Sequence, residues 1–457
     1  MQINKWTRIE LFVYSSLVFF GLLAVWSAFV RPFGHDEFEA IHTAWKMWSG
    51  ERIYLDFFQH HHFLYYPILG WLISIFSESV NMVLAARGLS LMMALGIVWI
   101  TYRIGTLRYT REIALLAVFL LTTTFIFLDK VLEVRPDVPQ ALSGLIAIFF
   151  WLQYDENKKR GYLILTAFAL FVSFLFLQKA VFLIALLGLY TLYRLIKKTL
   201  PFSDFLLLWG ILSSFLLFVV GYLVQTGIWS EYFFLNWTVN TRLLNTFSPL
   251  EYLWFSMIEN PVLWLVYFGG SGWFLITKKI QLISYLALGL LMSVFLARTP
   301  FAQYYLMALP LVSLIAAETS ILLMRRFKEV PVLCLLGLSV LYPAFLVYDE
   351  AHKTNREQFA KIESVLSVTA ATDLVYDGDA NFNLFRKDLD YFWFSVKPKK
   401  GVLAAYQTLR PYEYDPYLLI QSRQPKLISD SFLSTKNPII RDGYTRSEKY
   451  KDFWIRK

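Results

Sequence analysis

Apolar residues in the first 348 positions gather into long runs that short polar connectors separate. Runs of roughly 17 to 25 residues have the length that crosses the hydrocarbon core of a bilayer as a helix. The pattern predicts an all-α polytopic membrane protein with about eleven transmembrane helices. The expected spans cover residues 11–30, 81–101, 113–128, 138–154, 162–177, 180–196, 205–224, 253–276, 281–297, 303–323 and 330–348.

One apolar run, residues 63–76, is shorter and is typical of an interfacial helix rather than a span. Basic residues decide its assignment. If this run does not cross, the short connectors on the N-terminal side hold sixteen Lys and Arg, against nine on the other side. The positive-inside rule then places the N-terminus in the cytoplasm, whereas counting residues 63–76 as a span breaks that rule.

The first apolar run follows basic residues, so it is either a signal peptide or a retained membrane anchor. Its length and the lack of a small-residue cleavage pattern favour the anchor.

The apolar runs stop at residue 349, which divides the chain into a transmembrane domain (1–348) and a C-terminal domain (349–457). Because the number of spans is odd, the C-terminal domain is expected outside. We expect a small α/β domain with a helix at 354–369, a strand at 373–376, a turn at 377–379 and a second helix at 383–394.

Composition agrees with a membrane protein, since 57% of the residues are hydrophobic and 17% are charged. The net charge of +9 could indicate nucleic-acid binding, but the basic residues lie in the connectors of one side and act as a topology signal. No nucleic-acid partner is expected. The single cysteine, Cys334, lies in an apolar run, which excludes a disulfide framework and a thiolate metal site.

The first long polar interruption, from His35 to His62, holds five acidic residues and five of the six histidines. Apolar residues at helical spacing predict an amphipathic helix that lies flat at the outer interface; they are Phe38, Ile41, Trp45 and Trp48. Asp36 with Glu39 three positions on is close to a capping box, so Asp36 is either an N-cap or a functional carboxylate. A carboxylate held at a helix start can serve as general base for an acceptor hydroxyl.

His60, His61 and His62, with Asp56 and His42, are candidate ligands of a divalent metal. Three consecutive histidines cannot all face one ion in a regular segment, so a solvated loop is the alternative. No cofactor is certain, and a divalent metal stays an open candidate.

Further charges occupy the outer connectors. Asp137 after Pro136 is typical of a helix start, where it complements the helix dipole. Arg135 and Asp137 nevertheless lie near the bilayer boundary, where ionisable residues are usually functional. Lys179 and Arg298 either snorkel or offer cations to a lipid-linked phosphate.

These residues together resemble the GT-C superfamily of integral-membrane glycosyltransferases. The similarity is strongest to the protein O-mannosyltransferases and the aminoarabinose transferases that modify lipid A. It rests on the Asp36-Glu37 pair after an anchor, a short interfacial helix, an aspartate after the third span, and the Gln303-Tyr304-Tyr305 stretch before Pro310. The chain departs from the family where His60-His61-His62-Phe63 replaces the usual proline-containing motif, and where Ala180 replaces a glycine.

The resemblance implies an inverting transferase that uses a polyprenyl-phosphate-linked sugar. Its catalytic residues would be Asp36, as the base, with Glu37 beside it. The acceptor would be the hydroxyl of a lipid, a glycan or a protein, and membrane lipids would be partners. It implies an extracytoplasmic active site in a bacterial cytoplasmic membrane. The substrate-binding candidates are Asp56, Arg135, Asp137, Lys179, Arg298, Tyr304 and Tyr305.

Three other classes of protein compete with this reading. A secondary transporter would place charges near the centres of Gly/Pro-broken spans, whereas here they cluster at one face. A lipid-linked polysaccharide ligase or polymerase would carry its residues in a late outer loop, but residues 225–251 hold only Glu231, Arg242 and Glu251 as charged groups. A non-catalytic scaffold would not need the acidic cluster.

Overall fold

A computed structural model describes residues 8–243, 248–276, 281–297, 300–394, 396 and 401–457. The chain forms two compact units. The first, called the helical unit here, contains Met1–Val30, Leu89–Val219 and Thr246–His352. The second, called the loop unit, contains Arg31–Gly88, Val220–Asn245 and Lys353–Lys457. Each unit therefore combines segments that lie far apart in the sequence, and the division falls inside two helices, α4 and α10.

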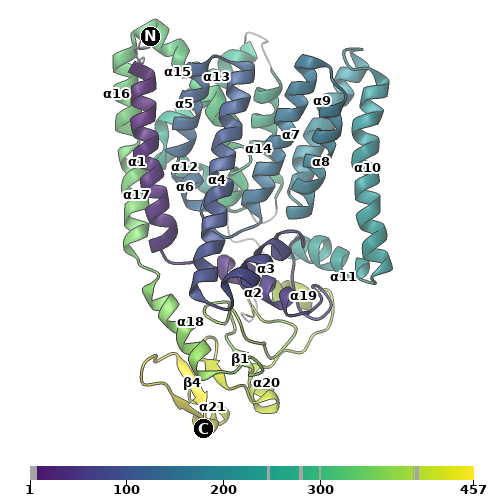
Figure 1. The fold of residues 1–457 in the computed structure, drawn as a ribbon, viewed down its shortest axis with the longest axis vertical. Helices are drawn as coiled ribbons and strands as arrows, with labels where there is room; N and C mark the ends of the chain where they lie inside the picture. The colour runs from purple at the N-terminus through teal and green to yellow at the C-terminus, as the bar shows by residue number, and fades with distance from the viewer. Residues whose placement is uncertain (1–7, 244–247, 277–280, 298–299, 395, 397–400) are drawn as a thin grey trace. The chain divides into compact units, whose positions relative to one another are not determined.

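The helical unit is built from helices that run in alternating directions (Figure 1). Its elements are α1 (Arg8–Val30), α4 (Val80–Arg108), α5 (Arg111–Thr122), α6 (Phe125–Val131), α7 (Asp137–Asn157), α8 (Gly161–Phe176), α9 (Ala180–Ile196), α10 (Phe202–Gln225), α12 (Pro249–Glu259), α13 (Pro261–Ile276), α14 (Leu282–Leu296), the 3₁₀ turn η3 (Ala302–Tyr305), α15 (Leu309–Phe327), α16 (Glu329–Ser339) and α17 (Leu341–His352).

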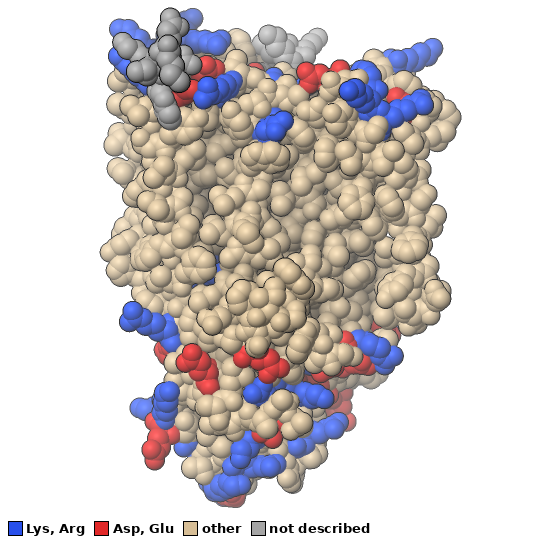
Figure 2. Space-filling model, in the orientation of Figure 1, with Lys and Arg blue, Asp and Glu red and all other residues tan. Residues whose placement is uncertain are grey.

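Close helix packing holds the helical unit together. α7 packs on α8, and α15 packs on both α5 and α13. Gly105 lets α4 approach α5, because a Cβ there would lie 2.7 Å from the Cβ of Ala114 and 2.9 Å from its Cα. The outer surface is apolar: Leu217 and Phe218 on α10 are 70% and 74% exposed. A broad band of this unit in Figure 2 accordingly shows few charges.

Four stretches of the described chain are apolar and long enough to cross a membrane: Arg8–Val30, Val80–Arg108, Phe202–Gln225 and Glu329–Val368. α5 and α6, bent by 70° at their break, add a fifth if they form one span. The other expected spans coincide with helices, but several of these, such as α8, α9 and α14, are shorter. The number eleven therefore stays a prediction.

The loop unit contains a small sheet with helices around it. Its strands, in the order β1-β2-β4-β3, pair parallel between β1 and β2 and antiparallel elsewhere. Its elements are α2 (His35–Trp48), α3 (Tyr65–Phe76), α11 (Trp229–Phe233), the π-helix η1 (Phe234–Val239), the 3₁₀ turn η2 (Asn240–Arg242), α18 (Arg356–Val368), β1 (Val375–Tyr376), α19 (Gly401–Gln407), α20 (Pro416–Arg423), β2 (Leu427–Ser429), α21 (Pro438–Gly443), β3 (Tyr444–Arg446) and β4 (Phe453–Arg456). The expected helix at 354–369 and strand at 373–376 correspond to α18 and β1.

The amphipathic helix predicted in the first loop forms as α2, but protein covers most of its apolar face. Phe38, Ile41 and Trp45 are at most 3% exposed, and α3 packs against the helix, whereas Trp48 is 50% exposed. The expectation that this whole apolar face meets an interface is therefore wrong for Phe38, Ile41 and Trp45. α3 is the element that suits an interface, because its Trp71 is 65% exposed.

The prediction of a helix at residues 383–394 is also wrong, because this stretch is irregular. The Asp377 carboxylate accepts N–H groups from Asn381, Phe382 and Asn383 at 2.7–3.0 Å, which fixes a turn at its start. Downstream, aromatic rings pack instead of following a helical stripe. The ring of Phe392, for example, stacks on Phe58 with centroids 4.6 Å apart.

Candidate functional site

The first turn of α2 presents two adjacent acids in different environments. Gly34 is the N-cap, and its N–H donates to Glu37 Oε2 at 2.8 Å. Asp36 is therefore not the N-cap that the sequence offered as one reading. It lies in the first helical turn and is partly exposed, whereas Glu37 is only 1% exposed.

Arg87 of α4 holds Glu37 and the chain before it. Its guanidinium donates to Glu37 Oε1 and Oε2 at 2.8 and 2.6 Å, and to the carbonyls of Arg31 and Pro32 at 2.7 and 2.6 Å. It also lies 3.6 Å from the ring centroid of Phe33. Burial raises the pKa of Glu37, but the charge and hydrogen bonds of Arg87, the charge of Arg31 and the N–H of Gly34 together hold that pKa below its usual value. This clamp fixes the direction in which α2 begins and leaves Glu37 ionised.

A second buried network lies further along α2. His42 Nε2 and Lys46 Nζ each lie 2.8 Å from Asp388 Oδ2, and Lys46 also pairs with Glu51 at 3.0 Å. Burial raises the pKa of Asp388, but His42 and Lys46 together hold it below its ordinary value. Asp388 was not predictable from the sequence, because its partners lie more than 300 positions earlier.

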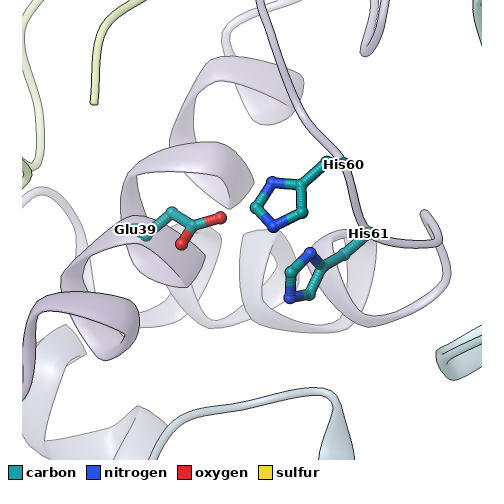
Figure 3. Close-up of side chains that lie close together, drawn as sticks. All are labelled: Glu39, His60 and His61. Carbon is teal, nitrogen blue, oxygen red and sulfur yellow. The ribbon is translucent and has the colours of Figure 1, made fainter. Parts of the chain in front are cut away.

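Glu39, His60 and His61 form the cluster that suits a metal (Figure 3). One potential ligand atom from each lies within 4.8 Å of the others. Two histidine nitrogens and one carboxylate oxygen are the donor set of catalytic zinc sites that keep an open position. Two of the three predicted histidines thus come together, and Glu39 is a member that the sequence argument did not include.

Gln59, which is fully buried, organises this cluster. Its Nε2 donates to Glu39 Oε1 at 3.1 Å and to Thr43 Oγ1 at 2.9 Å. Its Oε1 accepts the backbone N–H groups of His60 and His61 at 2.7 and 3.2 Å. A single amide therefore positions all three candidate ligands, as outer-shell partners do in metal sites.

The remaining predicted residues of this loop lie apart from the cluster. His62 Nε2 is 3.0 Å from Tyr232 Oη, and the ring of His62 packs against Tyr232. Asp56 accepts hydrogen bonds from Arg52 Nε and Nη2 at 3.1 and 2.9 Å, which closes an exposed turn. The structure gives both residues local partners and brings neither to the Glu39 cluster.

A separate group of candidates lies in the helical unit at the start of α7. Asp137 Oδ1 accepts from Lys179 Nζ at 2.6 Å, and its Oδ2 lies 3.4 Å from Arg135 Nε. Lys179 Nζ also lies 3.3 Å from the ring centroid of Tyr304. The structure therefore brings together four residues that the sequence predicted from three different connectors.

Asp137, Lys179 and Tyr304 border a cavity of about 30 Å³. A cavity of that size holds about one or two waters, so a larger group must displace side chains to enter. Residues that line it include Asp137, Gln140, Lys179, Gln303, Tyr304 and Met307. Tyr305 is fully buried and donates to the carbonyl of Pro249 at 2.8 Å, so it supports this wall from behind. Arg298 lies outside the described residues.

Comparisons with known proteins bear on the fold. No curated protein matches the sequence. Residues 66–223 match the family model described as dolichyl-phosphate-mannose-protein mannosyltransferase. The chain is similar to the crystal structure of ArnT from Cupriavidus metallidurans bound to undecaprenyl phosphate, with a TM-score of 0.67, 13% identity, and coverage of 98% of this chain and 97% of that one.

Two archaeal structures are also similar. The oligosaccharyltransferase AglB from Archaeoglobus fulgidus, in complex with an inhibitory peptide and a dolichol-phosphate, has a TM-score of 0.57 and 11% identity, and the match covers 97% of this chain and 74% of that one. The Archaeoglobus fulgidus oligosaccharyltransferase in complex with Zn and sulfate has a TM-score of 0.52 and 11% identity, with coverage of 96% and 73%. The predicted resemblance is confirmed: this chain has the fold of the GT-C membrane glycosyltransferases.

Proposed function

We propose that this protein transfers a sugar from a polyprenyl-phosphate-linked donor to an acceptor hydroxyl, with inversion at the anomeric carbon. The fold and the family match over residues 66–223 support a glycosyltransferase. Similar structures contain undecaprenyl phosphate and dolichol-phosphate, which supports a lipid-linked donor.

The observation that carries this proposal is the clamped first turn of α2. Arg87 pairs with the buried Glu37, so the partly exposed Asp36 is the carboxylate of this turn that an acceptor can reach. In the proposed reaction Asp36 accepts the hydroxyl proton while the acceptor oxygen bonds to the anomeric carbon. The bond from that carbon to the phosphate oxygen breaks, and polyprenyl phosphate leaves from the opposite face. Glu37 is then a positioning residue.

Cations in the helical unit would stabilise the departing phosphate. Lys179 and Arg135 share the carboxylate of Asp137, which orients them beside Tyr304. Charge-assisted hydrogen bonds to a developing phosphate charge are a large electrostatic contribution to catalysis. We propose these residues and Arg298 as phosphate contacts, and Asp56 and Tyr305 as supports of the substrate region.

We also propose the finer topology that the sequence predicted. The chain would cross a bacterial cytoplasmic membrane eleven times, with its N-terminus inside and residues 349–457 outside. The short connector between α4 and α5 carries Arg108 and Arg111 at its two ends, and its positive charge supports this orientation.

Glu39, His60 and His61 would hold a divalent metal, and Gln59 would orient them. When bound, the ion would supply electrostatic stabilisation to negative charge near the base. Asp36 and Glu39 lie three positions apart on α2, so both face the same side of the helix. A related structure with bound Zn supports this choice of metal.

Metal content tests this assignment directly. Purified wild-type protein is expected to retain about one zinc ion per chain, as measured by inductively coupled plasma mass spectrometry. His60→Ala and His61→Ala should lose it, and Gln59→Ala should lower the affinity by roughly 10- to 100-fold. His62→Ala is the matched control, since His62 contacts Tyr232 instead, and it should retain zinc. Equal metal content in all four variants would contradict the site.

Transfer of radiolabelled sugar from a panel of polyprenyl-phosphate sugars tests the function. Wild type should consume one donor, and Asp36→Asn should lower that rate by at least about 100-fold, the scale of a lost general base. Asp442→Asn, which changes an exposed acid paired with Arg441, is the control with wild-type activity. An Asp36→Asn protein that folds and matches wild type would remove Asp36 from the role. A wild type that consumes no donor would favour a transporter.

A further inference from the structure

A cavity of about 300 Å³ lies within the loop unit, apart from the Glu39 cluster. Its walls include residues that follow β1 (Ala380, Asn381 and Phe382), the last residue of β2 (Ser429) and Ser431 beyond it. β1 and β2 are parallel, so both strands end at the same edge of the sheet. Ligands of open sheets with parallel strands bind beyond the carboxyl ends of those strands.

The opposite wall comes from the segment that carries the candidate base. Phe33, His35 and Phe38 line the cavity, and Asp36 lies between the last two in the sequence. His35 Nδ1 is 3.2 Å from Asp379 Oδ1, in the turn after β1. The cavity and the first turn of α2 are thus neighbouring parts of one compact unit.

Hydrogen bonds fix this wall in place. Gln358 of α18 donates from Nε2 to the carbonyl of Phe33 at 2.9 Å, and its Oε1 accepts the N–H of Phe33 at 2.7 Å. The rings of Phe33 and Phe38 stack with centroids 5.4 Å apart and an interplanar angle of 8°. An aromatic surface is therefore held in a defined orientation before any ligand binds, which lowers the cost of binding.

The polar part of the lining offers hydrogen bonds without net charge. Lys361 Nζ pairs with Asp452 Oδ2 at 2.9 Å, so the two charged residues of this lining balance each other. Ser429 Oγ and Ser431 Oγ lie 2.8 Å apart, and each hydroxyl can both donate and accept. Phenyl rings beside hydroxyl and amide groups suit a neutral ligand with apolar C–H faces and several hydroxyls.

We propose that this cavity binds the acceptor and that the acceptor is a neutral saccharide, so that the protein extends or decorates a glycan. This inference rests on the proposed function and names its acceptor class. One acceptor hydroxyl would reach Asp36 and lose its proton there, while the sugar ring lies against Phe33 and Phe38. A single saccharide unit fits the volume, and the rest of a longer glycan would extend to solvent.

Two independent readouts test the proposal on full-length protein in detergent. The first is saturation-transfer NMR with methyl glycosides of glucose, galactose, mannose and N-acetylglucosamine. The second compares transfer of donor sugar to these glycosides with release of free sugar to water. Ser431→Phe fills the cavity, and Ser434→Phe places the same side chain at an exposed position outside its lining.

We expect wild type and Ser434→Phe to bind at least one glycoside. Ser431→Phe should weaken that binding by at least about tenfold, which is about 1.4 kcal/mol, while release of sugar to water continues. Binding that is unchanged in Ser431→Phe, or that no glycoside shows, would overturn the acceptor site even if donor is consumed. Transfer to a serine-containing peptide alone would also overturn it. Failure to consume donor with glycoside binding intact would instead contradict the proposed function.

Discussion

Two neighbouring carboxylates at the start of α2 differ because of what surrounds them. Glu37 is enclosed with Arg87, whose guanidinium contacts both of its oxygens, and Asp36 is partly exposed. A fully paired buried acid cannot accept a substrate proton without breaking its ion pair. The proposed division of roles between Asp36 and Glu37 therefore rests on burial rather than on residue type.

Replacing Glu37 by Gln should destabilise the loop unit. Arg87 would remain buried without a counter-charge, which costs about 3–5 kcal/mol. Because the native pKa of Glu37 is below 4.5, the stabilisation from its ionised form is complete above that pH in wild type, and it is lost as the pH falls through the native pKa. Glu37→Gln should lack this acid-dependent loss.

Thermal unfolding in detergent at several pH values measures both effects. Arg52→Gln is a suitable control, because Arg52 is an exposed residue whose ion pair with Asp56 contributes little. A Glu37→Gln protein as stable as wild type at neutral pH would show that the Glu37–Arg87 pair does not secure α2.

The sequence placed Asp137, Arg135 and Lys179 at the ends of apolar runs, and the family resemblance added Tyr304. The structure brings these four residues into one group. The partner of His42 was not predictable, because a contact between distant segments leaves no local pattern. The role of Gln59 was not predictable for another reason, since its hydrogen bonds to Glu39, Thr43, His60 and His61 depend on how the loop folds back on α2.

At the level of elements, periodicity located helices well but not their surroundings. The apolar stripe of α2 can pack against either lipid or protein, and the spacing of its residues is the same in both cases. The structure covers Trp45 of α2 and exposes Trp71 of α3. At residues 383–394 the sequence pattern is helical, but the structure is irregular, because the hydrogen bonds of Asp377 fix a turn there.

The contact between α4 and α5 depends on Gly105. Alanine normally stabilises a helix relative to glycine by about 1 kcal/mol. At this position the added Cβ would meet Ala114 at 2.7 Å, and overpacking typically costs about 1–3 kcal/mol. Gly105→Ala should therefore lower the unfolding temperature in detergent.

Gly210→Ala on α10 is the matched control, because a Cβ there meets nothing within 4 Å. It should leave the unfolding temperature unchanged or raise it. If Gly105→Ala behaves like Gly210→Ala, α4 and α5 are not closely packed at Gly105.

At the scale of the whole molecule, the loop unit is assembled from three separated segments. Residues 220–245 contribute Glu231, which pairs with Arg410 at 2.8 Å, and Asn240, whose Nδ2 donates to the carbonyl of His60 at 2.9 Å. Residues 353–457 contribute Trp393, whose Nε1 donates to the carbonyl of Phe58 at 3.1 Å. The first loop thus depends on partners from both later segments.

Truncation after His352 should leave the first loop incompletely folded. The truncated chain lacks Asp388, Trp393 and Gln358, each of which contacts residues 31–88. Limited proteolysis followed by mass spectrometry should show faster cleavage within residues 31–88 than in the full chain, with α7 and α8 cleaved at equal rates in both. Equal protection of residues 31–88 would show that the first loop folds without the C-terminal segment.

The separation of His42 from Asp388 by 346 positions also orders events during synthesis. At about 5–20 residues per second, roughly 20 to 70 seconds pass between the appearance of α2 and that of its partner. For most of that interval the ribosome-bound chain has Asp36 and the Arg87 clamp but lacks the C-terminal partners of α2. In the proposed function, sugar transfer would therefore begin only when the last quarter of the polypeptide has emerged.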